Sequence, residues 1–294
     1  MSSFLQFLVG GISLGSIYGL IALGYTMVYG IAKMLNFAHG DVIMVGAFMM
    51  FTALTKMGLP PVLCVIFGTI VCTVLGITIE KVAYKPLRKA TSLAVLITAI
   101  GVSYFLQNSA QLIFGAGTKT FTPLFGNGNI ALFDGQIVIS YNTIVTIIIS
   151  VVIMIALTLF INKTKTGRAM LAVSEDKGAA QLMGVNVNKT ISITFAIGSA
   201  LAAIAGALLC SSYPILSPTT GAMPGIKAFT AAVFGGIGSI PGAMIGGILL
   251  GVIENLSKVY ISTQLSDAIV FGILILILLI KPTGIMGKKI SEKV

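Results

Sequence analysis

The chain has 294 residues, of which 56% are hydrophobic and only 9% are charged, and its mean hydropathy is +1.05. A soluble domain of this length needs many more charged side chains to cover its surface, so the composition excludes the soluble globular classes. The apolar runs are unbroken and about twice the roughly ten residues of a membrane β-strand. We therefore predict an all-α, polytopic integral membrane helical bundle, with residues 1–294 forming a single transmembrane domain.

The net charge of +10 is concentrated in three segments. Residues 80–91, 163–190 and 281–294 each carry a net charge of +3. Basic clusters beside apolar segments follow the positive-inside rule, so all three are predicted to be cytoplasmic. This clustering does not fit a nucleic-acid partner, and membrane lipid is the expected surrounding.

The first predicted membrane segment runs from Phe4 to Tyr29. The N-terminal residues lack the basic region of a signal peptide, so we interpret them as the start of this segment. Gly11, Gly15 and Gly19 are spaced four residues apart and share one helical face. Such a ladder of small residues predicts close packing against another helix.

The second segment, predicted to end near Leu54, begins with Asn36 and the sequence Phe-Ala-His-Gly-Asp. It contains His39, the single histidine of the chain, and Asp41 two residues later. Ionisable groups at a membrane entrance are costly and often functional, which indicates a translocation path. The alternative is that His39 and Asp41 lie in the headgroup region and cap the helix.

The third segment begins at the pair Pro60 and Pro61 and ends at Ile79, and the fourth is predicted over Ser92–Phe114. The fourth contains three amides, Gln107, Asn108 and Gln111, of which Gln107 and Gln111 share a face. Buried amides in a membrane either join helices or line a wet path, and the sequence favours neither.

Residues 115–136 have no net charge and are predicted to lie outside, before a fifth segment over Ile137–Ile161. Residues 163–190, which we name the island, then separate it from a sixth segment over Ile191–Leu209. The island holds seven of the chain's 26 charged residues.

A short helix is predicted within the island, with Ser174 as its cap, Glu175 and Asp176 in its first turn and Gly184 at its end. Ala179, Leu182 and Met183 would form one apolar face. Such a helix at a membrane surface is suited to dock into a groove on another protein. A solvated loop between helices is the alternative.

The apolar run Ile226–Ile253 is interrupted by Gly235, Gly236, Gly238 and Pro241, and neither half is expected to span a bilayer comfortably. A break of this kind is tolerated where it lines a cavity, which indicates a translocation path. It is predicted to be a re-entrant hairpin or two short spans. A polar loop over Glu254–Asp267 and a last segment over Ser266–Ile280 follow. About eight membrane segments result, with the N-terminus outside.

No catalytic set or metal site is predicted. Cys64, Cys72 and Cys210 fall in apolar segments without a recognisable spacing and are expected to be buried. The sequence Gly284-Ile-Met-Gly-Lys-Lys lacks the spacing and final Ser or Thr of a phosphate-binding loop. An ion-coupled secondary carrier would need intramembrane acids or bases, and the candidates Asp41 and Glu254 look interfacial. A membrane-embedded enzyme would need a clustered catalytic set.

Four stretches together resemble a known family. They are ALGYTMVYGIAKMLNFAHGD, GRAMLAVSEDKGAAQLMGVN, KAFTAAVFGGIGSIPGAMIGG and KPTGIMGK. The chain is similar, nearly end to end, to permease subunits of bacterial branched-chain amino acid ABC importers, of the first-permease type of the leucine, isoleucine and valine system.

The resemblance implies a non-catalytic, multi-pass subunit of the inner membrane that carries no cofactor. Its expected partners are a second permease subunit, two cytoplasmic ATPase subunits that bind the ATP, and a periplasmic or lipid-anchored binding protein. The family's coupling motif maps onto Arg168, Ala169, Glu175, Asp176 and Gly184. Relatives also carry urea, short-chain amides or other amino acids, so the sequence leaves the substrate open.

Overall fold

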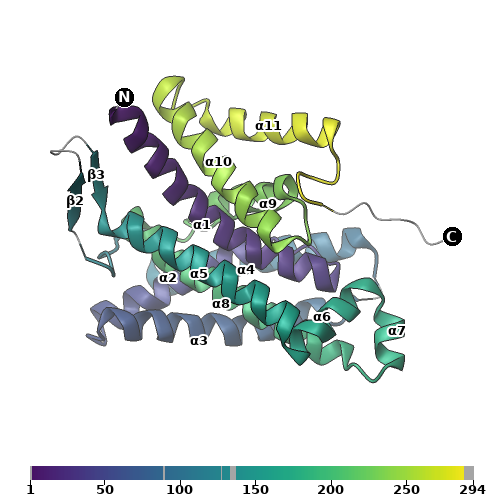
Figure 1. The fold of residues 1–294 in the computed structure, drawn as a ribbon. Coiled ribbons are helices and arrows are strands. Elements are labelled where there is room, and N and C mark those ends of the chain that lie inside the picture. The colour runs from purple at the N-terminus through teal and green to yellow at the C-terminus, as the bar shows by residue number, and fades with distance from the viewer. Residues whose placement is uncertain (1, 89, 127, 133–136, 288–294) are drawn as a thin grey trace.

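The computed structural model describes residues 2–88, 90–126, 128–132 and 137–287. They form a helical bundle, with short strands in two of its loops (Figure 1). In chain order the elements are α1 (Ser2–Ala32), α2 (His39–Thr55), α3 (Pro61–Ile79), the π-helix η1 (Glu80–Tyr84), α4 (Ser92–Phe114), β1 (Lys119–Thr120), β2 (Asn129–Leu132), β3 (Ile137–Ser140), α5 (Tyr141–Lys163), α6 (Lys165–Glu175), α7 (Lys177–Leu182), α8 (Val187–Ser212), β4 (Ile215–Leu216), α9 (Ala222–Gly235), α10 (Ile240–Tyr260) and α11 (Ser266–Ile280).

Six helices of the described chain are long and apolar enough to cross a membrane, namely α1, α3 with η1, α4, α5, α8 and α10. The helices α2 and α11 are apolar but shorter. The chain is therefore an all-α, polytopic membrane protein, as its composition predicts. The count of eight membrane segments stays a prediction.

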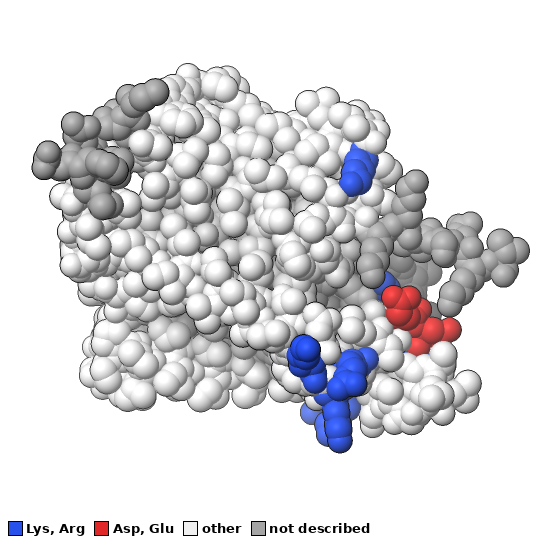
Figure 2. All heavy atoms as spheres, viewed as in Figure 1, with Lys and Arg blue, Asp and Glu red and all other residues white. Residues whose placement is uncertain are grey.

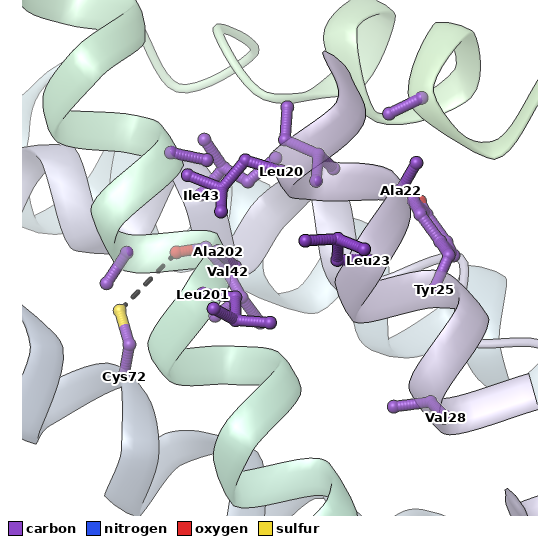
Figure 3. Packing of buried hydrophobic residues seen from close by; sticks show 14 of the residues in the cluster. Leu20, Ala22, Leu23, Tyr25, Val28, Val42, Ile43, Cys72, Leu201 and Ala202 are labelled. Atoms are coloured by element: carbon purple, nitrogen blue, oxygen red, sulfur yellow. Dashed lines mark hydrogen bonds between the residues drawn. The ribbon is translucent and has the colours of Figure 1, made fainter. Parts of the chain in front are cut away.

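The core of the bundle lies around α1 and α8, which are mostly buried, whereas fewer than a third of the residues in the spans of α3, α4 and α5 are buried. Figure 3 shows side chains from α1, α2, α3 and α8 meeting in this core. Cys72 of α3 is fully buried there, and its thiol donates to the Val42 carbonyl at 3.5 Å. All three cysteines are buried, which confirms that prediction.

The predicted glycine ladder of α1 lies against α10. A Cβ atom added at Gly15 would lie 2.6 Å from the Cα atom of Ile248 and 2.7 Å from the Gly247 carbonyl oxygen. Gly247 and Gly251 of α10 face the backbone of Gly19 and Gly15 in return. The two helices therefore meet backbone to backbone, at a distance that only glycine allows.

Two opposite ends of the bundle can be recognised. At one end β1 pairs antiparallel with β4, and Phe121 donates its N–H to the Pro214 carbonyl at 3.2 Å. At the other end Lys177 of the island donates to the Ala32 carbonyl at 2.9 Å, and Arg88 donates to Asn188. The basic segments thus gather at one end, which we name the island end. Figure 2 shows charged atoms gathered around α6 and α7 on a face that is otherwise almost entirely uncharged.

The turn between α9 and α10 also lies at the island end. A Cβ atom at Gly30 of α1 would lie 3.3 Å from the Cα atom of Gly238. Ile285 and Met286 donate their backbone N–H groups to Phe234 and Gly235, each at 2.9 Å. The turn is therefore fixed to the segment that follows α11, and α9 and α10 form an antiparallel pair (Figure 1).

Several boundaries differ from the predictions, and two of these differences matter most. The fifth segment begins at Tyr141, because Ile137–Ser140 pairs as β3 with β2. The second half of the interrupted run is long enough to span, since α10 continues to Tyr260. Glu254 was expected in a polar loop, but it lies inside α10 and is 1% exposed, because two lysines compensate its charge there.

Replacing Gly15 with Leu should disrupt the bundle. The new side chain would meet the α10 backbone, which cannot move aside like a side chain, so the cost should exceed the about 1–3 kcal/mol of ordinary overpacking. Gly101→Leu on α4 is the matched control, because nothing lies within 4 Å of its added Cβ atom. The measurement is the amount of detergent-extracted protein that elutes as one monodisperse peak. Equal recovery of both variants would contradict the packing argument.

Candidate functional site

A polar corner lies where α1 leads into α2, and it collects predicted path residues from separate parts of the sequence. Asn36 is buried, and its Oδ1 atom accepts a hydrogen bond from the Tyr84 hydroxyl at 2.9 Å. Asp41 is 2% exposed, and its Oδ1 atom accepts from Nε2 of Gln107 at 2.8 Å. The corner therefore connects the α1–α2 linker to η1, and α2 to α4.

His39 completes the polar corner and is 1% exposed. Its ring packs edge-on against Tyr25, with 4.6 Å between the ring centroids, and its Nε2 atom has no hydrogen-bond partner in the described structure. Ala38 is the N-cap of α2 and makes no side-chain cap hydrogen bond, and His39 and Asp41 lie in the first turn of that helix. Both ionisable groups point into the bundle, where they contact neighbouring helices.

The structure does not bring Gln111 into the polar corner. Its side chain is exposed on α4, as is that of Asn108, which donates to the Tyr104 carbonyl of its own helix at 2.7 Å. Of the three predicted amides, Gln107 alone joins another helix in the described structure.

The glycines Gly235, Gly236 and Gly238 lie elsewhere, at the α9–α10 turn. Gly236 and Gly238 have φ values of +103° and +97°, which side chains rarely adopt. Added Cβ atoms would meet the backbone of Gly242 at Gly235 and of Gly287 at Gly236. These glycines therefore allow a tight turn against the C-terminal segment. That they line a path stays a prediction.

The island contains two helices, and the predicted cap is wrong. Ser174 lies inside α6 and donates to the Leu171 carbonyl at 2.7 Å, while Glu175 is the last residue of α6. The reason is that Thr164 already caps α6 ten residues earlier. Asp176 is the true N-cap of α7, since its carboxylate accepts from the N–H groups of Gly178 at 2.7 Å and Ala179 at 3.0 Å.

The predicted end of the island helix at Gly184 is confirmed. Gly184 has a φ of +83° and donates to the Gln181 carbonyl, while Val185 donates to the Ala180 carbonyl, both at 3.0 Å. This pair of bonds is the Schellman arrangement, which ends a helix with a left-handed glycine.

The island leaves an exposed apolar tip on α7. Leu182 is 91% exposed and Met183 is 84% exposed, whereas Ala180 on the opposite side is buried. Arg168 on α6 is exposed, and Ala169 beside it is half-buried. Two large apolar side chains on a helix fixed at both ends form a surface that another protein can bind.

Sequence reasoning missed a buried ionic cluster at the end opposite the island. Lys227 of α9 is 6% exposed and contacts Glu254 of α10 at 2.8 Å and Asp267 of α11 at 2.7 Å. Glu254 also accepts from Lys258 at 2.5 Å. Glu254 is therefore buried and paired inside the bundle, and its depth in the membrane stays a prediction. The lone lysine in an apolar run was the signal that could have revealed this cluster.

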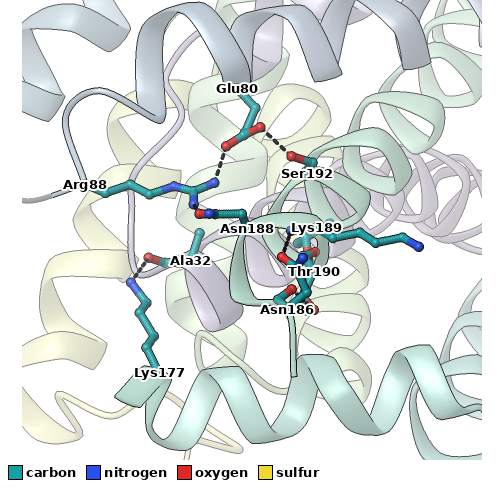
Figure 4. Close-up of polar contacts among 10 residues, drawn as sticks. Ala32, Glu80, Arg88, Lys177, Asn186, Asn188, Lys189, Thr190 and Ser192 are labelled. Carbon is teal, nitrogen blue, oxygen red and sulfur yellow. Dashed lines mark hydrogen bonds and ion pairs between the residues drawn. The ribbon is translucent and has the colours of Figure 1, made fainter. Parts of the chain in front are cut away.

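A second missed network lies at the island end, around η1 (Figure 4). Glu80 is fully buried, and its two carboxylate oxygens accept from Arg88 and, at 2.6 Å, from Ser192 of α8. Arg88 also donates to Asn188. The network fixes the loop before α4 onto the start of α8, beside the island.

The sequence profile of a family described as "Branched-chain amino acid transport system / permease component" matches residues 7–278. The chain is 47% identical to the high-affinity branched-chain amino acid transport system permease protein BraD of Pseudomonas aeruginosa, over 99% of this chain and 98% of that protein. It is 47% and 46% identical to the corresponding LivH proteins of Salmonella typhimurium and Escherichia coli, with the same coverage.

Replacing Gln107 with Leu should lower the thermal stability of the protein in detergent. The change removes a donor from the buried Asp41 carboxylate, and a buried acceptor left unsatisfied costs about 1–3 kcal/mol or more when it is charged. Gln111→Leu is the control, because it makes the same change one turn further on the exposed face. An equal shift in Tm for the two variants would show that the Gln107 bond to Asp41 is not stabilising.

Proposed function

This chain belongs to the family of permease components of branched-chain amino acid transport systems, and on that premise we propose that it is the permease subunit of an ABC importer. It moves branched-chain amino acids across the bacterial inner membrane. The observation that carries this proposal is the exposed tip of Leu182 and Met183, on a helix held between two membrane helices, α5 and α8.

The tip is proposed to be the contact for an ATPase. Asp176 at the start of α7 and Gly184 at its end fix the direction in which Leu182 and Met183 point. The short helix therefore presents its side chains without the entropic cost of ordering a loop. ATP is proposed to be bound and hydrolysed by two such subunits, so this chain itself is not an enzyme.

The remaining partners are a second permease subunit and a periplasmic or lipid-anchored binding protein that delivers the amino acid. The apolar surface that α3, α4 and α5 expose supports contact with lipid and with the second permease.

The polar corner is proposed to lie on the path of the amino acid. Asn36, His39, Asp41 and Gln107 are polar groups within an otherwise apolar bundle, and such groups often mark substrate pathways. Three contacts join these residues to one another or to other elements, so a change in helix packing would change their surroundings. The glycine turn of Gly235, Gly236 and Gly238 is proposed as a hinge, because its conformation depends on the segment after α11.

The substrate is proposed from the relatives. The proteins that share 46–47% identity over nearly their whole length are named for branched-chain amino acids. A charged backbone and an apolar side chain fit a path that is apolar apart from a few polar groups.

Leu182→Asp should remove the ATPase from the purified complex. The substitution places a charge in the apolar contact, and an uncompensated buried charge costs several kcal/mol. The variant should still insert and pair with the second permease, whereas ATPase recovery and amino acid uptake should fall to background. The measurement is ATPase pull-down beside uptake into proteoliposomes.

Ile261→Asp is the matched control, because Ile261 is an exposed apolar residue at the opposite end of the bundle. It should leave ATPase recovery unchanged. Normal ATPase recovery and normal uptake with Leu182→Asp would exclude docking at this tip.

The orientation can be tested independently. A fluorescent protein fused after Lys177 should fluoresce in the cytoplasm, because basic loops are retained inside. Alkaline phosphatase fused after Gly126 should be active outside. The measurement is paired alkaline phosphatase and fluorescent-protein activity. An external signal at Lys177 would contradict the cytoplasmic docking of α7.

A further inference from the structure

Two hollows lie next to each other at the island end, and Arg88 and Lys177 line both of them. One, of about 480 Å³, extends between the island and the start of α8, where Asn186 and Asn188 line it. The other, of about 240 Å³, extends between the end of α1 and the start of α4, where Lys33 and Ser92 line it. Figure 4 shows Arg88 extending toward Glu80 and Asn188, and Lys177 extending to the Ala32 carbonyl.

The hollows are strongly basic. Lys33, Arg88 and Lys177 contribute three positive charges, and no Asp or Glu is among the described residues that line them. Glu80 behind them pairs with Arg88 and offsets one charge. Burial, together with the like charges of Arg88 and Lys33, lowers the pKa of the Lys177 ammonium below its ordinary value. A bound anion would relieve this repulsion.

Hydrogen-bond donors are also in excess. The Nε atom of Arg88 is buried and has no hydrogen-bond partner in the described structure, although the other nitrogens of its guanidinium bond to Glu80 and Asn188. A buried donor without an acceptor is costly. An oxyanion beside Arg88 and Lys177 would supply both the acceptor and the negative charge.

The smaller hollow also has an apolar wall. Tyr29 lines it from the end of α1, and Met34 and Leu35 line it from the linker that follows. Leu87 lines it from the loop before α4, and Val95 from the start of α4. Because α1 ends and α4 begins here, this is where the proposed orientation puts the cytoplasmic surface of the membrane. Cations beside an apolar wall at this depth suit a ligand with an anionic head and an apolar tail.

We propose that these two hollows form a binding site for the phosphate of an anionic phospholipid headgroup. Lys33, Arg88 and Lys177 bind the phosphate, and the acyl chains of the lipid lie along the wall of the smaller hollow. Basic pockets between membrane helices on the cytoplasmic side bind such headgroups in other proteins. The site rests on the proposed membrane orientation but requires neither transport nor ATPase binding. A loss of lipid binding can therefore be distinguished from a loss of transport or of ATPase binding.

The test uses the purified complex with its partner subunits, stripped of lipid in detergent, and counts bound lipid by native mass spectrometry. Phosphatidylglycerol should bind, and phosphatidylcholine should bind at least tenfold more weakly. Lys33→Met and Lys177→Met should each weaken phosphatidylglycerol binding about fivefold, the effect of one cation near a membrane surface. Lys165→Met, an exposed island lysine that lines neither hollow, should leave binding unchanged.

Several outcomes would overturn the site. Equal binding of the two lipids, or an equal loss with Lys165→Met, would show nonspecific adsorption. Displacement of phosphatidylglycerol by millimolar inorganic phosphate would identify a free-phosphate site instead. Unchanged lipid binding with loss of ATPase recovery in Lys177→Met would identify an acidic group of the ATPase as the occupant. Because Lys177 also bonds to Ala32, Lys33→Met decides the question if the Lys177 variant does not fold.

Discussion

The bundle depends on the backbone contact between α1 and α10. Inside a membrane, lipid tails are as apolar as leucine, so helices associate through close van der Waals contact rather than through burial from water. Gly15 and Gly19 on one helix and Gly247 and Gly251 on the other allow the closest approach. Since α9 packs on both α1 and α10, and α11 packs on α10 and α9, this contact also helps to position the helices from α9 onward against the first helix.

Buried charges join helices that are not held together by the glycine contact between α1 and α10. Lys227 joins α9 to Glu254 on α10 and to Asp267 on α11 at one end, and Glu80 joins η1 to Arg88 and α8 at the other. A single charge at such a position would be costly, but each group has a partner on a different element. Because either partner alone would be destabilising, these networks specify which helices lie side by side.

The island and the polar corner are connected through the end of α1. Lys177, the first residue of α7, holds the Ala32 carbonyl, and Asn36 follows a few residues later. Lys33 between them has a φ of +58°, an uncommon conformation for a residue other than glycine. A partner that moved α7 would therefore act on the short linker that leads to His39 and Asp41. This arrangement is consistent with a subunit whose cytoplasmic contact controls a path inside the bundle.

The amino-acid sequence alone was sufficient to predict the class of fold, the basic segments at one end, the bounds of α4 and α11, the glycine face of α1 and the helix end at Gly184. Each follows from local chemistry: length, hydropathy, residue spacing and the backbone freedom of glycine. The tertiary structure alone decided that Asp41 bonds to Gln107, that Lys227 is compensated by Glu254, and that Asp176 rather than Ser174 caps α7. The two pairs depend on which residues from distant segments meet, because a polar group can be buried only beside a partner, and residue spacing along one segment does not specify that partner. The cap depends on where the preceding helix, α6, ends.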